Sequence, residues 1–118
     1  MAYKFSFEKL EAWQLYKDFI KEIYKITKDF PDSEKYGLVS QINRASLSIA
    51  SNLAEGSSRT SSKDQAHFSQ LAYSSLMEVI CQLIISKELE YISEEELETI
   101  SKELDSIMKM NHNLQKTL

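Results

Sequence analysis

Few residues of this chain have the types and the spacing that chemistry requires. A dinuclear metal site in a helical bundle needs two Glu-x-x-His motifs and further carboxylates, whereas the sequence contains one acid-x-x-His pair, Asp64 with His67. The other histidine, His112, has Lys109 three residues before it. No serine or cysteine has a histidine and an orienting acid that the sequence places beside it, and no glycine-rich phosphate loop is present. The sequence therefore predicts no metal, no cofactor and no small-molecule substrate.

Two classes of function stay open on these residues. The first is a non-enzymatic scaffold that assembles with itself and binds RNA or a protein partner. The second is a small enzyme that uses the carboxylates of Glu55 and Glu78, or the Asp64–His67 pair. A scaffold should hold these carboxylates paired and buried without a cavity, and an enzyme needs an open pocket beside them. We favour the scaffold.

One segment has the composition of a ligand site. The run from Ser57 to Lys63 collects hydroxyl groups and two cations immediately before a predicted helix. Helix N-termini attract phosphate, so Arg59, Ser62 and Lys63 are candidate contacts for a phosphate group or RNA. The alternative is a solvated turn. The whole chain carries a formal charge of −4 and has a pI near 5.2, which gives no general attraction to nucleic acid.

Start and stop signals divide the chain into the elements that must position these residues. Phe30-Pro31 ends a first helix, and Gly56 is the expected left-handed end of a second. Capping boxes that begin at Ser62 and Ser93 open a third and a fourth. The predicted helices span residues 7–29, 33–55, 63–87 and 94–117. Because the connections are short, we expect one all-α domain over residues 1–118, an antiparallel up-down-up-down four-helix bundle.

The middle of the chain is almost free of charge. Between Tyr36 and Ser86 the sequence has only six Lys, Arg, Asp or Glu residues. In the third predicted helix, apolar residues occupy more than half of the circumference, although a four-helix core needs only a narrow stripe from each helix. Surface helices normally carry Lys and Glu on their outer side. We therefore expect this hairpin to be covered both by its own bundle and by another subunit.

A polar stripe without lysine follows the second predicted helix. Its members share the three-and-four spacing of one helix face: Gln41, Arg44, Ser48, Asn52 and Glu55. We interpret it as a buried, mutually satisfied network that includes Glu78, with Arg44 and Glu78 paired because they lie level in the hairpin. The alternative is a solvated face.

The single cysteine, Cys81, excludes an internal disulfide and favours a reducing compartment. We expect it to be a small buried apolar residue. The N-terminal residues lack the apolar core of a secretion signal, and the apolar stretch over residues 79–85 is too short to span a bilayer. These observations predict a soluble, cytoplasmic protein that does not bind a membrane.

The second predicted helix also carries a family resemblance. Tyr36-Gly37-Leu38, Gln41, Arg44-Ala45, Ser48-Ile49, Asn52 to Gly56 and Arg59 resemble the signature of four-helix-bundle proteins encoded in intervening sequences of bacterial 23S rRNA genes, the S23 family. The resemblance implies a cyclic pentamer, and a related branch is the accessory protein of diversity-generating retroelements, which binds reverse transcriptase and nucleic acid. The role of the intervening-sequence branch itself is not established. Asn43 stands where the family often has a second basic residue.

Opposite charges on two helices offer a further route to assembly. The first predicted helix has a basic line, formed by Lys17, Lys21, Lys25 and Lys28. The fourth has an acidic surface, formed by Glu94, Glu95, Glu98, Glu103 and Asp105. Opposite surfaces suit a head-to-tail contact between copies, which can close into a ring. The alternative is that these charges only solubilise two outer faces.

Overall fold

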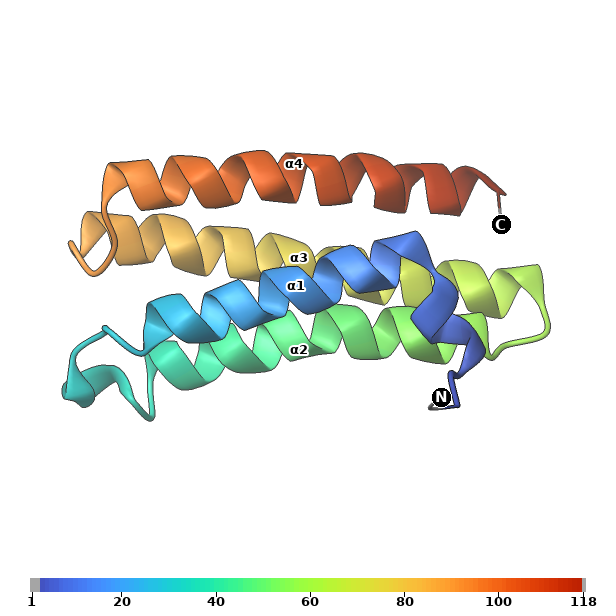
Figure 1. The fold of residues 1–118 in the computed structure, drawn as a ribbon, viewed down its shortest axis with the longest axis horizontal. Helices are drawn as coiled ribbons and strands as arrows, with labels where there is room; N and C mark the ends of the chain where they lie inside the picture. The colour runs from blue at the N-terminus through green and yellow to red at the C-terminus, as the bar shows by residue number, and fades with distance from the viewer. Residues whose placement is uncertain (1–2, 118) are drawn as a thin grey trace.

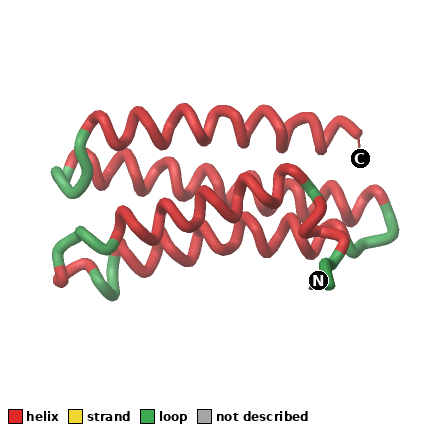
Figure 2. Tube along the Cα trace, viewed as in Figure 1, coloured by secondary structure: helices red, strands yellow, loops and turns green. Residues whose placement is uncertain are grey.

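The computed structural model describes residues 3–117, with the side chains of residues 3–107 and of Lys109. Four helices form the molecule: α1 (Glu11–Thr27), α2 (Leu38–Ser57), α3 (Ser62–Glu88) and α4 (Glu94–Thr117). Figure 1 shows the three connections between them at alternate ends, so successive helices run in opposite directions. Within the described residues no strand occurs (Figure 2). The predicted all-α four-helix bundle is confirmed.

The core is a single apolar cluster to which all four helices contribute. Its central side chains are fully buried, among them Tyr16 and Phe19 of α1, Ile49 of α2 and Leu76 of α3. The α2–α3 hairpin has the most extensive contact, and α1 and α4 pack more loosely over it. In the described residues α3 contacts α2 and α4 but not α1, which places α1 and α3 at opposite corners of the bundle.

Both of the first two helices begin later than the sequence predicts. A separate 3-10 turn, η1 (Ser6–Lys9), precedes α1, because Leu10 between them is extended at φ −72° and ψ 126°. A second 3-10 turn, η2 (Asp32–Glu34), precedes α2. The Glu34 carboxylate accepts a hydrogen bond of 3.2 Å from the backbone N–H of Leu38. This bond satisfies one free donor at the start of α2, which is why the helix begins there.

Two expected helix boundaries are wrong and one is confirmed. Gly56 does not end α2 in a left-handed conformation: it lies inside the helix, buried, and no described glycine has a positive φ. At the start of α3 the N-cap is Ser61 rather than Ser62, and its hydroxyl accepts a hydrogen bond of 3.1 Å from the backbone of Asp64. The box at α4 forms as predicted, since Ser93 and Glu96 exchange two hydrogen bonds of 3.0 Å.

The α3–α4 connection is held by backbone and side-chain hydrogen bonds together. Glu90 has a φ of 64°, and the N–H groups of Glu90 and Tyr91 donate to Lys87 and Ser86, the pattern of a Schellman motif. The Tyr91 hydroxyl also donates a bond of 2.9 Å to Glu34 of η2. These contacts fix the two loops at the same end of the bundle (Figure 1).

Candidate interaction surfaces

The polar stripe of α2 is formed by short local bonds. The Arg44 guanidinium donates 2.7 Å to the Gln41 side chain one turn earlier, and both residues are exposed. The amide of Asn52 donates to the carbonyl and hydroxyl oxygens of Ser48, at 2.8 Å and 3.0 Å. One described hydrogen bond crosses from the stripe to α3: the Ser75 hydroxyl donates 3.0 Å to Ser48.

The expected buried network does not form within a single chain. Gln41, Arg44, Glu55 and Glu78 are exposed, and Ser48 and Asn52 are partly buried. Arg44 and Glu78 are not paired, because the Glu78 carboxylate accepts from its helix neighbour Gln82 at 3.4 Å. Both helices turn these side chains toward solvent, where each charge keeps its hydration and gains a local amide partner. An exposed ion pair between Arg44 and Glu78 would therefore add little to the stability of the protein.

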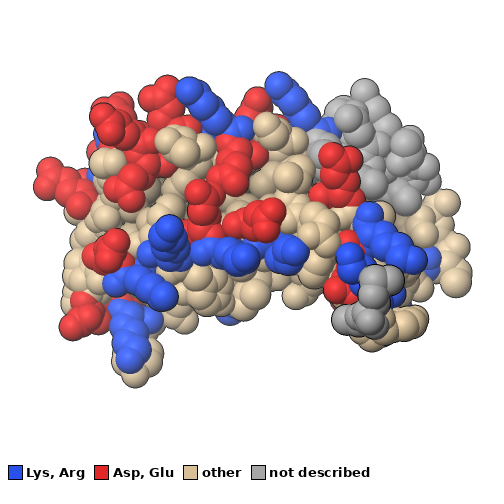
Figure 3. Space-filling view, in the orientation of Figure 1, with Lys and Arg blue, Asp and Glu red and all other residues tan. Residues whose placement is uncertain are grey.

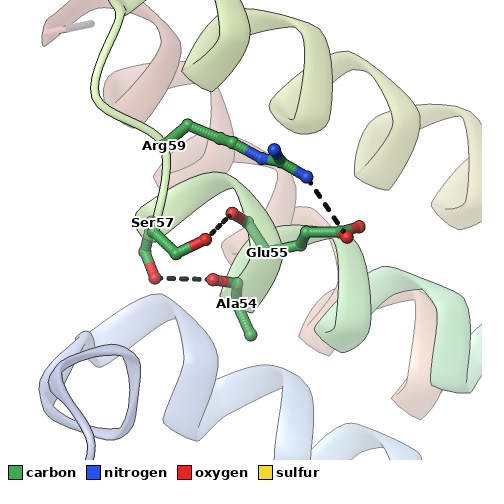
Figure 4. A network of polar contacts seen from close by, with 5 residues as sticks. Ala54, Glu55, Ser57 and Arg59 are labelled. Carbon is green, nitrogen blue, oxygen red and sulfur yellow. Dashed lines mark hydrogen bonds and ion pairs between the residues drawn. The ribbon is translucent and has the colours of Figure 1, made fainter.

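In the turn between α2 and α3, the Arg59 side chain contacts other residues of the same chain. Figure 4 shows Arg59 reaching back to Glu55, with an ion pair of 3.4 Å. The same guanidinium lies 4.7 Å from the ring centroid of Phe68, a cation–π contact. Ser61 already caps α3, while Ser62 and Lys63 are exposed and have no described hydrogen bond from their side chains to protein. Of the three candidate phosphate contacts, one is therefore engaged and two are open.

The carboxylates of the enzyme alternative are not gathered in a pocket. Glu55, Glu78, Asp64 and His67 are all exposed. None of them lines the hollow of about 230 Å³ beside Gly56, or either of two larger hollows on the described surface. Among the described residues no group of three or more His, Cys, Asp or Glu side chains is placed to hold a metal ion, and the His112 side chain lies outside that range.

The outer side of α3 carries a continuous, almost uncharged surface. We call it the α3 outer face and define it as Leu71, Ser74, Glu78, Cys81, Ile85 and Leu89, all of which are exposed. Leu71, Ile85 and Leu89 expose 38%, 46% and 49% of their surface. Cys81 is also exposed, so the expectation that it is buried is wrong. Sequence analysis found the excess of apolar residues on α3 but not which side of the helix would be left open.

A second apolar surface is concave. We call it the α1/α2 groove, a hollow of about 360 Å³ on the outside of the bundle. Its lining residues are Phe7, Trp13, Lys17, Ile20, Lys21, Leu47, Ala50, Ser51 and Ala54. Sequence reasoning missed this groove. The small residues Ala50 and Ala54, one turn apart on α2, are the signal that would have indicated it.

The charged helices α1 and α4 lie side by side on one face. In Figure 3 the basic side chains follow α1, and acidic side chains gather over α4 next to it. The ion pairs of the described residues join Arg59 to Glu55, Lys87 to Glu88 and Lys109 to Asp105, and none of them joins α1 to α4. Pairing of these surfaces between copies stays a prediction.

Two carboxyl groups meet where α4 packs on α1. A side-chain hydrogen bond to Glu22, then partial burial, then the charges of Glu22 and Asp18 raise the pKa of Glu103 to about 7. One oxygen of Glu22 is buried and has no hydrogen-bond partner among the described residues. The raised pKa means that Glu103 keeps its proton to a higher pH in the folded protein than an exposed glutamate would.

This pair makes stability depend on pH. Glu103 has an ordinary pKa of 4.5 and a folded pKa of about 7, so its contribution is complete below pH 4.5 and is lost as the pH rises toward 7. We expect Glu103→Gln to raise the free energy of unfolding relative to the parent by about 1 kcal/mol at pH 8, and by little at pH 4.5, because solvent screens part of the effect. Urea denaturation at the two pH values measures the difference. The exposed Glu98→Gln is the control, and an equal effect of both variants would contradict the prediction.

By length and hydropathy alone, α3 qualifies as a membrane-spanning helix. The apolar stretch over residues 79–85 is too short to span a bilayer, but the complete helix of 27 residues is long enough. A helix from the core of a bundle passes the same test, and Ala72, Leu76, Val79 and Leu83 of α3 are buried against the other helices. The test therefore gives only weak support to membrane insertion.

The fold and these surfaces define a four-helix bundle with two uncovered apolar regions and no assembled catalytic centre in its described residues. A model of the 23S rRNA-intervening sequence protein family matches residues 8–113, so the chain belongs to this family. The resemblance noted from α2 is thereby confirmed. The relation to the retroelement accessory protein stays a prediction.

A solved structure has the same fold. A protein of unknown function from the S23 ribosomal protein family of Bacteroides thetaiotaomicron VPI-5482 matches with a TM-score of 0.79 and 23% identity, over 89% of this chain and 98% of that one. At this identity the likeness shows a shared fold alone. The comparison with curated proteins gave no match.

Proposed function

We propose that this protein is a non-enzymatic scaffold that works as a homo-oligomer. The observation that carries the proposal is the α3 outer face, on which six consecutive outward positions include one charged residue and three large apolar side chains. A helix that is apolar on all sides is normally covered on all sides. An uncovered apolar strip on a chain of this size is typical of a protein contact.

The enzyme alternative has less support. Its carboxylates are dispersed over the outside of the α2–α3 hairpin, and general acid–base catalysis requires them to converge on one substrate. RNA binding also has less support than self-association, since Arg59 is engaged by Glu55 and Phe68 and the chain is acidic overall. A protein or RNA bound by the assembled scaffold stays a prediction, as does a cytoplasmic location.

We expect a mass several times 13.7 kDa in solution, and the family resemblance implies five copies. Light scattering coupled to size exclusion, at low micromolar concentration and physiological salt, measures it. The variant Ile85→Glu, which places a charge in the apolar C-terminal part of the α3 outer face, should lower the mass while leaving helical content unchanged. A parent protein that elutes at 13.7 kDa would exclude the proposal, and a dimer would keep self-assembly but exclude a ring.

A further inference from the structure

The α3 outer face has the spacing of a helix that packs along another element. Leu71, Ser74, Glu78, Cys81 and Ile85 alternate at steps of three and four residues, which is the pattern of a packing seam. These residues are exposed, so no described part of the same chain covers them. The strip is convex, apolar at both ends, and carries one negative charge near its middle.

The α1/α2 groove is complementary in shape and in charge. It is a concave channel between two helices with an apolar floor, which is the form that receives the ridge of a third helix. Lys17 and Lys21 stand on its α1 side. The Lys17 ammonium donates to Gln14 and lies near the Trp13 ring. Neither lysine takes part in an ion pair within the described residues.

The two surfaces lie on different sides of one molecule. In the described residues α3 contacts α2 and α4 but not α1, so its outer face points away from the groove that α1 forms with α2. A copy that offers its α3 face to a second copy therefore keeps its own groove free for a third. Contacts of this head-to-tail kind repeat from copy to copy and close into rings when the rotation allows.

A two-fold contact between two α3 faces fits less well. It would bring two Glu78 carboxylates into one apolar interface to which the α3 outer face contributes no cation. Like charges that lose their water cost free energy unless an opposite charge meets them. The groove supplies that opposite charge.

We propose that the α3 outer face of one copy docks in the α1/α2 groove of the next copy, with Glu78 opposite Lys21. The proposal rests on the proposed self-assembly and adds which surfaces meet. Glu78 lies at the middle of the strip, and Lys21 is the last lining residue on α1, at the end of the groove where Leu47 is the last on α2. The apolar side chains on one side of Glu78 then cover the apolar floor.

The single native cysteine allows a direct test of this geometry. Cys81 lies on the α3 outer face, and Ser51→Cys places a second thiol in the groove. With a short bis-maleimide, this variant should give a ladder of covalent trimers and larger species, because each chain then links at two different surfaces. The parent protein, which has Cys81 alone, should stay monomeric on a denaturing gel. The matched control Ser101→Cys, on the exposed side of α4, should give no ladder.

A charge exchange tests the pairing of Glu78 with Lys21. Glu78→Lys and Lys21→Glu should each raise the concentration at which the assembly dissociates by about tenfold or more. The double variant should return it to within about threefold of the parent, because the two charges again attract each other. Circular dichroism of each variant checks that the bundle itself is intact.

The outcomes separate this proposal from the proposed function. A parent protein that is monomeric in solution overturns both. An oligomeric parent with no ladder from Ser51→Cys, or with no recovery in the double variant, keeps self-assembly and overturns this interface. A strong covalent dimer from the parent protein alone shows that two α3 faces meet and overturns it as well.

Discussion

Gly56→Ala should destabilise the protein by about 2 kcal/mol, although alanine is the better helix former. A Cβ atom built at Gly56 would lie 2.8 Å from the Cβ of Phe68 on α3. That atom is attached to the backbone and cannot turn away, so α2 and α3 must move apart. Over-packing of this kind costs about 1–3 kcal/mol, and the gain in helix propensity of at most about 1 kcal/mol does not cancel it.

Chemical denaturation at one fixed protein concentration measures this change, since assembly adds to apparent stability. Ser57→Ala is the control one residue further along the same helix, where the side chain is exposed. It should change the free energy of unfolding by less than about 0.5 kcal/mol. A Gly56→Ala protein as stable as the parent would mean that the hairpin adapts without loss.

Tyr16→Phe should stabilise the protein by about 1 kcal/mol, against the usual direction of a core substitution. Tyr16 is fully buried, and its hydroxyl has no hydrogen-bond partner among the described residues. Burial raises the pKa of this hydroxyl above its ordinary value. Phenylalanine keeps the ring and removes a polar atom that lost its water on folding without gaining a bond in exchange.

Tyr91→Phe is the matched comparison, because it removes the same phenolic oxygen from a tyrosine whose hydroxyl does make a hydrogen bond. The Tyr91 hydroxyl donates 2.9 Å to Glu34, and this bond raises the pKa of Tyr91. Its loss should lower stability. Thermal unfolding of the two variants should therefore shift in opposite directions from the parent, and a Tyr16→Phe protein that is less stable would reveal a partner for the hydroxyl.

Local signals along the chain were enough to predict four helices and their approximate bounds. Pro31 and the Ser93–Glu96 box act within one or two turns of chain, so their effect does not depend on the rest of the fold. The third helix was predicted to within one residue at each end. The resemblance in α2 likewise identified the family that the comparison confirmed.

Which side of each helix faces the core depends on packing between the helices and could not be predicted from the chain alone. On α3 apolar residues occur on every side, so periodicity did not distinguish the buried Leu76 and Val79 from the exposed Ile84 and Ile85. The same uncertainty explains the wrong expectation for Cys81. For Arg44 and Glu78 the chain spacing placed them level, but their pairing depended on the angle of each helix about its own axis. Gly56 is a further example, because its role also depends on a contact between helices. Its residue type suggested the end of a helix, whereas the close approach of Phe68 from α3 is the reason that a glycine is needed there.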